Sequence, residues 1–169
     1  ATAFGSVGGI ITRADMQKTP VRMWMFGLVS ILEMEMQRAI GRKFPNEEWQ
    51  SLLKANRLEM AERLFQIRSD QNESLDLLDC LQLADKITIF EKTDSLSNAT
   101  GVHSKKQFSR NMRKIEKLRN SLAHSRELSP EAWPSWAECL ARGEDFLNGL
   151  QGSTSNQFES ERARQSPIV

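Results

Sequence analysis

The sequence predicts an all-α protein, a helical bundle of about four to six helices with a short N-terminal β-strand segment. Its 169 residues match one domain of ordinary size. Hydrophobic residues make up 39% of the chain, and after Pro20 most of them recur at helical spacing. The stretch SVGGIIT before Pro20 is instead short, Gly-rich and β-branched, which is typical of a strand. We therefore divide the chain into residues 1–19, a helical domain at 20–151 and a tail at 152–169.

Composition limits the classes of partner and compartment. The 23 basic and 22 acidic residues nearly cancel, so net charge alone predicts no partner and the distribution of charge has to be considered. The only cysteines, Cys80 and Cys139, are too few for a disulfide framework, and we expect buried, reduced thiols in a cytoplasmic protein. The most apolar run, residues 23–32, is shorter than the roughly 20 residues that cross a bilayer, so we expect no membrane partner. Because the chain begins at Ala1, we expect it to be part of a longer protein.

The first half of the helical domain begins at Pro20, a residue suited to the first turn of a helix. A long helix is predicted from Val21 to about Ile40. It is apolar over much of its circumference, which indicates burial in the core or in a subunit interface. A second helix is predicted after Pro45 with Asn46 as its N-cap, and residues 57–69 either continue it or begin another. Four of the seven methionines lie in the first helix: Met23, Met25, Met34 and Met36.

The next segment, residues 72–92, is predicted to be a single core helix capped by Ser74, because its apolar residues form one broad face. Residues 93–103 are rich in Ser, Asn, Thr and Gly and are predicted to be a loop. Ser104 then caps a helix that runs through at least Leu122. Its predicted apolar stripe is Phe108, Met112, Ile115, Leu118 and Leu122. A last helix is capped by Ser129, and the polar, aperiodic residues 152–169 are predicted to be disordered.

A concentration of positive charge lies at residues 105–119. This stretch holds seven basic residues against one acid, Glu116, a local charge of +6 in a chain of net charge +1. Basic residues at helical spacing on one face can follow a phosphate backbone, which makes RNA a candidate partner. The alternative is a solvated face opposite the apolar stripe. The basic stripe consists of Lys106, Arg110, Arg113 and Lys117.

The stretch LRNSLAHS, residues 118–125, follows directly. A histidine such as His124 titrates near neutral pH and can accept or donate a proton, and the planar fork of Arg119 matches a phosphate. Asn120 is four residues before His124 and shares its helical face, whereas Arg119 lies about 140° around the helix. A break in the helix near Ala123, or a second subunit, would have to bring Arg119 and His124 together. Such a set could cleave RNA without a metal, with histidine taking the proton of a ribose 2′-OH and arginine stabilising the charge on phosphorus.

The segment KIEKLRNSLAHS resembles the signature of the HEPN superfamily, an arginine followed by a polar residue and by a histidine four to six residues beyond the arginine. The matching positions are Arg119, Asn120 and His124, and the resemblance covers roughly residues 21–150. It implies an all-α bundle and a homodimer with two motifs facing each other across the interface.

Many members of this superfamily are metal-independent endoribonucleases, which would make His124 the general acid/base, Arg119 the phosphate clamp and Asn120 the orienting residue. Other members are non-catalytic binding or assembly modules, and a dimerisation module remains the alternative here. The toxin branch often has a tyrosine two residues after the histidine, where this chain has Arg126.

The segment GGIITRADM, residues 8–16, resembles the end of a CBS domain, a strand and small-residue turn followed by Thr12-x-x-Asp15. The resemblance implies that Thr12 and Asp15 contact the ribose of an adenine nucleotide. Because the rest of such a domain is missing, we expect nucleotide binding and regulation only in a longer protein. The alternative is that both residues cap the following turn.

Metal and cofactor chemistry are not expected. His103, His124 and the two cysteines lack the short ligand spacing of a zinc site. The run GSVGG lacks the lysine of a phosphate-binding loop. The sequence therefore predicts a metal-free protein without a cofactor.

Overall fold

The computed structural model describes Asp15, residues 17–101 and 104–124 and, toward the C-terminus, residues 134, 136–138, 141–143 and 146–149. Within these residues all regular structure is helical, which confirms the all-α class. The elements in chain order are α1 (Thr19–Lys43), η2 (Glu48–Leu52), α2 (Ala55–Asp70), η3 (Leu77–Cys80), α3 (Leu83–Lys92), α4 (Asp94–Ala99) and α5 (Lys105–Ala123), where η2 and η3 are 3₁₀ helices. The predicted N-terminal strand, Thr12, His103, Ser129, Cys139 and the tail at 152–169 lie outside the described residues. None of the described helices is long and apolar enough to span a membrane.

The first helix agrees with the prediction in position, and the structure buries one side of it in the core. Pro20 lies in the first turn of α1, as expected. One side of α1 packs into the core through Met25, Leu32 and Met36, among others. The opposite side exposes five large apolar side chains. These are Met23, Trp24, Phe26, Ile31 and Met34.

The predicted single helix at residues 72–92 is wrong. Residues 72–92 do not form one helix, because η3 ends at Cys80 and α3 begins at Leu83. The carboxylates of Asp79 and Asp85 accept hydrogen bonds from the backbone N–H groups of Asp76 (2.6 Å) and Gln82 (3.1 Å), respectively. Each bond caps a new helical start, so local capping overrides the apolar period, and Ser74 is not the cap.

The region around residue 46 also differs from the prediction. Asn46 is not an N-cap, because the 3₁₀ helix η2 follows Glu47, which has a left-handed backbone (φ 61°). The following helix is separate and begins at Ala55. Residues 93–103 are not simply a loop either, since they contain the short helix α4.

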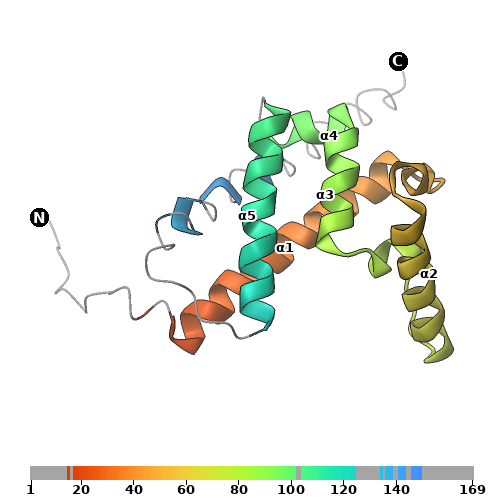
Figure 1. Ribbon diagram of the computed structural model, residues 1–169, viewed down its shortest axis with the longest axis horizontal. Helices are drawn as coiled ribbons and strands as arrows, with labels where there is room; N and C mark the ends of the chain where they lie inside the picture. The colour runs from red at the N-terminus through yellow and green to blue at the C-terminus, as the bar shows by residue number, and fades with distance from the viewer. Residues whose placement is uncertain are drawn as a thin grey trace, which may run out of the picture.

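The core lies between α1, α3 and α5, and Figure 1 shows α3 and α5 crossing the same side of α1. The Phe90, Phe108 and Phe146 rings, from α3, α5 and the C-terminal region, meet with centroids 5.9–6.0 Å apart. The Nζ of Lys86, only 3% exposed, is 3.1 Å from the Glu33 carboxylate and so ties α3 to α1.

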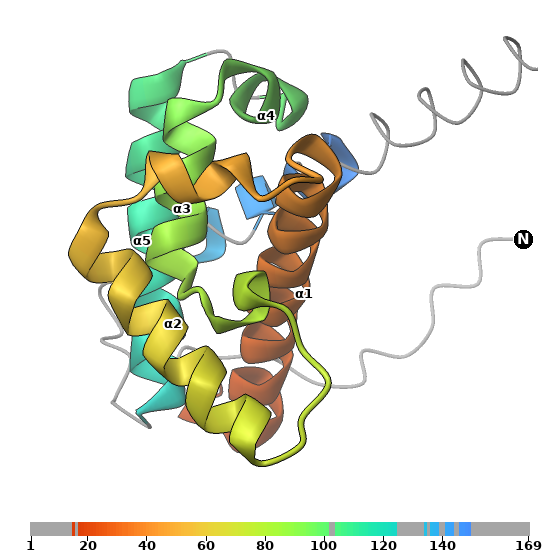
Figure 2. The same ribbon diagram turned by 90° about the vertical axis from the view of Figure 1, so that its right-hand side faces the viewer.

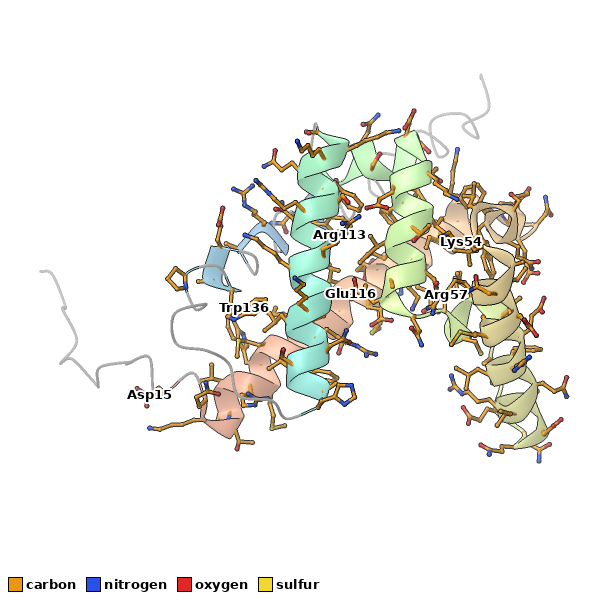
Figure 3. The ribbon with its side chains drawn as sticks, in the orientation of Figure 1. Asp15, Lys54, Arg57, Arg113, Glu116 and Trp136 are labelled. Atoms are coloured by element: carbon orange, nitrogen blue, oxygen red, sulfur yellow. The ribbon has the colours of Figure 1, made fainter. Side chains whose placement is uncertain are left out.

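The second α-helix, α2, is the least embedded of the longer helices. Ala61 is its only buried residue, and Met60, Leu64 and Ile67 form an exposed apolar stripe. The helix lies at one side of the bundle in Figure 1 and in front of it in Figure 2. Arg57 fastens it to α3 by two bonds to the Asp85 carboxylate, of 2.7 and 2.8 Å. Figure 3 shows Arg57 on the side of α2 that faces α3.

The fifth α-helix, α5, is confirmed almost as predicted. The Ser104 hydroxyl accepts a hydrogen bond from the backbone N–H of Gln107 (3.4 Å), so Ser104 is the N-cap. The helix ends at Ala123. Its predicted apolar stripe is buried in full, which leaves the opposite face of α5 to the basic residues.

Candidate functional site

The basic face of α5 borders a surface groove of about 730 Å³. All four residues of the predicted stripe line it, together with Lys114. At a rise of about 1.5 Å per residue, the row from Lys106 to Lys117 is roughly 17 Å long. Among the described residues, the lining comprises Ser104, Lys106, Gln107, Ser109, Arg110, Arg113, Lys114 and Lys117.

The charge in this groove is only partly offset by nearby acids. Glu138 accepts a hydrogen bond from Arg142 (2.8 Å), and this bond, with the positive charges of Arg142, Lys114 and Arg110, lowers the pKa of the Glu138 carboxyl below its ordinary value. Glu138 therefore stays ionised, and it lies close enough to the groove to interact electrostatically with Lys114 and Arg110. At the start of α5, Lys105 forms an ion pair with Asp94. The remaining cations make the groove a strongly positive strip suited to a polyanion.

The histidine of the motif lies at the end of α5. His124 is the C-cap, and its backbone N–H donates to the carbonyl oxygen of Asn120 (3.1 Å). The His124 and Asn120 side chains are exposed. Because His124 is seven residues after Lys117, it continues the line of the basic stripe. Asn120 and His124 therefore lie one turn apart at the C-terminal end of α5, beyond Lys117, the last residue of the groove.

The arginine of the motif lies elsewhere on α5. Arg119 is half-buried, and its Nη1 donates to Oδ1 of Asn120 (3.4 Å). It is two residues after Lys117 and therefore nearly opposite the basic stripe around the helix axis. It is also four residues after the buried Ile115, so it flanks the core-facing side. The chain therefore presents Arg119 and His124 on different sides of the last turn of α5.

A second hollow, of about 480 Å³, lies between the first turns of α1 and the last turn of α5. The Nη2 of Arg22 donates to the carbonyl oxygen of Ser121 (3.3 Å) and so joins the two helices beside it. Sequence reasoning missed this hollow, since its walls come from segments about a hundred residues apart. The described residues that line it are Thr19, Arg22, Met23, Phe26, Gly27, Leu122 and Ala123.

The predicted nucleotide-binding residues lie at the N-terminal end of α1 or outside the described residues. Asp15 forms an ion pair with Lys18 (2.5 Å) just before α1. Its predicted partner in nucleotide binding, Thr12, is not among the described residues. In the described part of the chain, no three His, Cys, Asp or Glu side chains gather as a metal site. Comparisons with protein-family models, curated proteins and solved structures found no match.

Proposed function

We propose that the protein binds RNA along α5 and cleaves it at His124 without a metal ion. The observation that carries this proposal is the continuous line from the four cations of the groove to an exposed histidine at the end of the same helix. Lys106, Arg110, Arg113 and Lys117 would hold successive phosphates. The strand would then reach His124 about one and a half to two turns after Lys117.

The proposed reaction is an internal transesterification. His124 takes the proton of a ribose 2′-OH, whose oxygen attacks the adjacent phosphorus. The bond from phosphorus to the 5′-oxygen breaks, and that oxygen receives the proton that His124 has taken up. The products are a 2′,3′-cyclic phosphate and a free 5′-OH. Asn120, one turn before His124, would orient the reacting group.

Arg119 is proposed to clamp the phosphate that reacts at His124 of a second copy. Within one subunit it lies on a different side of the last turn, so the site needs a partner to be complete. The exposed apolar side of α1 is the surface that we assign to this homodimer, because Trp24, Ile31 and Met34 are each about half exposed. Replacing Ile31 and Met34 by glutamate should give a folded monomer that no longer cleaves RNA, measured by sedimentation and by the assay below. A monomeric wild type would contradict this part of the proposal.

The test of cleavage uses a mixed-sequence RNA in EDTA. We expect the wild type to produce cyclic-phosphate ends, and we expect His124→Ala and Arg119→Ala to produce none. Arg63→Ala is the matched control, since Arg63 is an exposed arginine on α2 that pairs only with the exposed Glu59. Equal cleavage by all four proteins would identify a contaminating nuclease and refute the assignment of these residues.

The second candidate function is a non-catalytic dimerisation module. Two observations on Arg119 favour this function: its hydrogen bond to Asn120 and its position beside the core. Both are consistent with a structural role for Arg119. In that case a folded dimer would cleave no RNA. The glutamate substitutions at Ile31 and Met34 would still abolish dimerisation.

A further inference from the structure

We infer that the hollow between the start of α1 and the end of α5 receives one nucleobase of a single-stranded RNA, next to the bond that is cleaved. This inference rests on the proposed function and adds to it a class of substrate and a specificity site. Of the described residues, those lining this hollow are distinct from the residues that line the basic groove.

The hollow has the size and the walls that a base requires. Its volume of about 480 Å³ lies in the range of pockets that hold small ligands, roughly 300–1,000 Å³. Phe26 is 41% exposed and Met23 is more exposed still, so both present apolar surface to the hollow. Unpaired RNA bases are recognised by stacking on exposed aromatic side chains of this kind.

Gly27 is one of the residues that line the hollow. A Cβ atom built on Gly27 would have no heavy atom within 4 Å, so a side chain at this position would extend into open space. A glycine inside a helix costs about 0.5–1 kcal/mol relative to alanine. The missing side chain therefore comes at the expense of helix stability, and it is next to the one exposed phenylalanine of the described residues, Phe26.

The polar groups of the hollow favour a nucleotide over an apolar peptide. Arg22 contributes a positive charge at the edge, and its guanidinium is held by the Ser121 carbonyl oxygen. Thr19 adds a hydroxyl group. A cation and a hydroxyl beside an apolar, aromatic wall suit a base that remains attached to its ribose and phosphate.

The place of the hollow relates it to the cleaved bond. Leu122 and Ala123 line it, and His124 is the next residue. A strand that follows the basic stripe reaches His124 on one side of the last turn of α5, and the hollow lies on another side of that same turn. A base beyond the reacting phosphate could therefore enter the hollow if the strand bends around the helix end. A paired base in a duplex could not leave its stack without breaking its pair, so the site selects single strands.

The dimer surface and the hollow adjoin each other on α1. Trp24, Ile31 and Met34, assigned above to the homodimer, are not among the residues that line the hollow. Met23 and Phe26 line it instead. Gly27 is three residues after Trp24 and four before Ile31, so it lies on the helix face of the dimer surface. The oligomeric state of each variant is therefore measured together with its affinity.

The experiment measures binding of three 12-nucleotide probes: a single-stranded RNA, the same strand with abasic positions in its central half, and a duplex. The variants are Phe26→Ala, which removes the ring, and Gly27→Leu, which fills the hollow in space that is open. Leu64→Ala is the matched control, because Leu64 is also 41% exposed but lies on α2. A preserved helical circular dichroism spectrum shows that each variant is folded.

We expect Phe26→Ala and Gly27→Leu to weaken binding of the intact single strand about tenfold, the effect of losing one stacked base. Their affinities for the abasic strand and the duplex should match the wild type, and Leu64→Ala should change nothing. Wild-type affinity of both variants for the intact strand would overturn the inference, and so would an equal loss on all three probes. The assay measures binding alone, so a failure to cleave RNA would refute the nuclease proposal and leave the base site standing. A wild type that binds no RNA would refute both.

Discussion

Replacing Arg57 by methionine should weaken the attachment of α2 to the bundle. The guanidinium donates from Nε (2.7 Å) and Nη2 (2.8 Å) to the carboxylate of Asp85, and Nη2 also donates to Oε1 of Gln82 (2.9 Å). The hydrogen bonds to Asp85 raise the pKa of Arg57 above its ordinary value, so the pair is stable in its charged form. Methionine keeps the length and apolar character of the side chain and removes only the charge and the donors.

The magnitude follows from burial. Asp85 is 4% exposed, and removing one partner of a buried ion pair typically costs about 3–5 kcal/mol. The Arg57 side chain is 28% exposed, so water can partly replace it. The backbone N–H of Gln82 also remains as a donor to Asp85. We therefore expect a loss of about 2–3 kcal/mol in the free energy of unfolding.

The assay is urea unfolding followed by circular dichroism. Arg63→Met is the control on the same helix, because Arg63 pairs with an exposed glutamate, and it should change stability by less than about 0.5 kcal/mol. Adding Asp85→Asn to Arg57→Met should restore part of the loss, since the buried negative charge disappears. If Arg57→Met is no more destabilising than Arg63→Met, the ion pair does not hold α2.

Four further predictions concern packing, charge and pH. Gly149→Ala should destabilise the protein by about 1–3 kcal/mol in thermal unfolding, because the new Cβ would lie 2.8 Å from the carbonyl oxygen of Ala99. The control Gly143→Ala should be tolerated, because the nearest atom to its new Cβ would be 3.5 Å away. The groove has five cations, which predict a slope of about −3.5 when the logarithm of single-strand RNA affinity is plotted against the logarithm of salt concentration. The double variant Lys106→Gln, Lys117→Gln should make this slope shallower by about 1.4. The control Lys54→Gln, outside the groove, should leave the slope unchanged. Glu138→Gln should tighten RNA binding about twofold at low salt in a filter-binding assay, because a negative charge beside Arg110 and Lys114 is removed, and unchanged affinity would refute this. Burial raises the pKa of the Cys80 thiol, so this thiol ionises at a lower pH in the unfolded chain than in the folded protein. The free energy of unfolding should therefore fall as the pH rises above about 8.5, and it should depend less on pH in Cys80→Ala.

The elements that sequence reasoning predicted correctly are those with one dominant local signal. In α5 the cap at Ser104, the apolar stripe and the basic stripe all agree with one helical period. The long apolar run of α1 was placed correctly, but its sequence could not show which half of the circumference meets the core. Its burial depends on the packing of α3 and α5, which lie far along the chain.

The errors have a different physical origin. The apolar period of residues 72–92 is real, but the side chains of Asp79 and Asp85 satisfy backbone N–H groups and start new helices within it. Both carboxylates are visible in the sequence, but the sequence alone does not show that they accept hydrogen bonds from the backbone. The hollow at Phe26 had no local signal, since it depends on the contact between Arg22 and Ser121. The grouping of the four basic residues was predictable because a helix determines it by spacing alone.

The cluster of three phenylalanines in the core has a consequence for how the sequence can change in evolution. Phe90, Phe108 and Phe146 come from three separate elements and share one volume, with ring centroids 5.9–6.0 Å apart. Interiors are close-packed, so a change of size at one of these positions can be accepted only with an opposite change at another. In related sequences we therefore expect the three positions to vary together, with their summed side-chain volume held nearly constant.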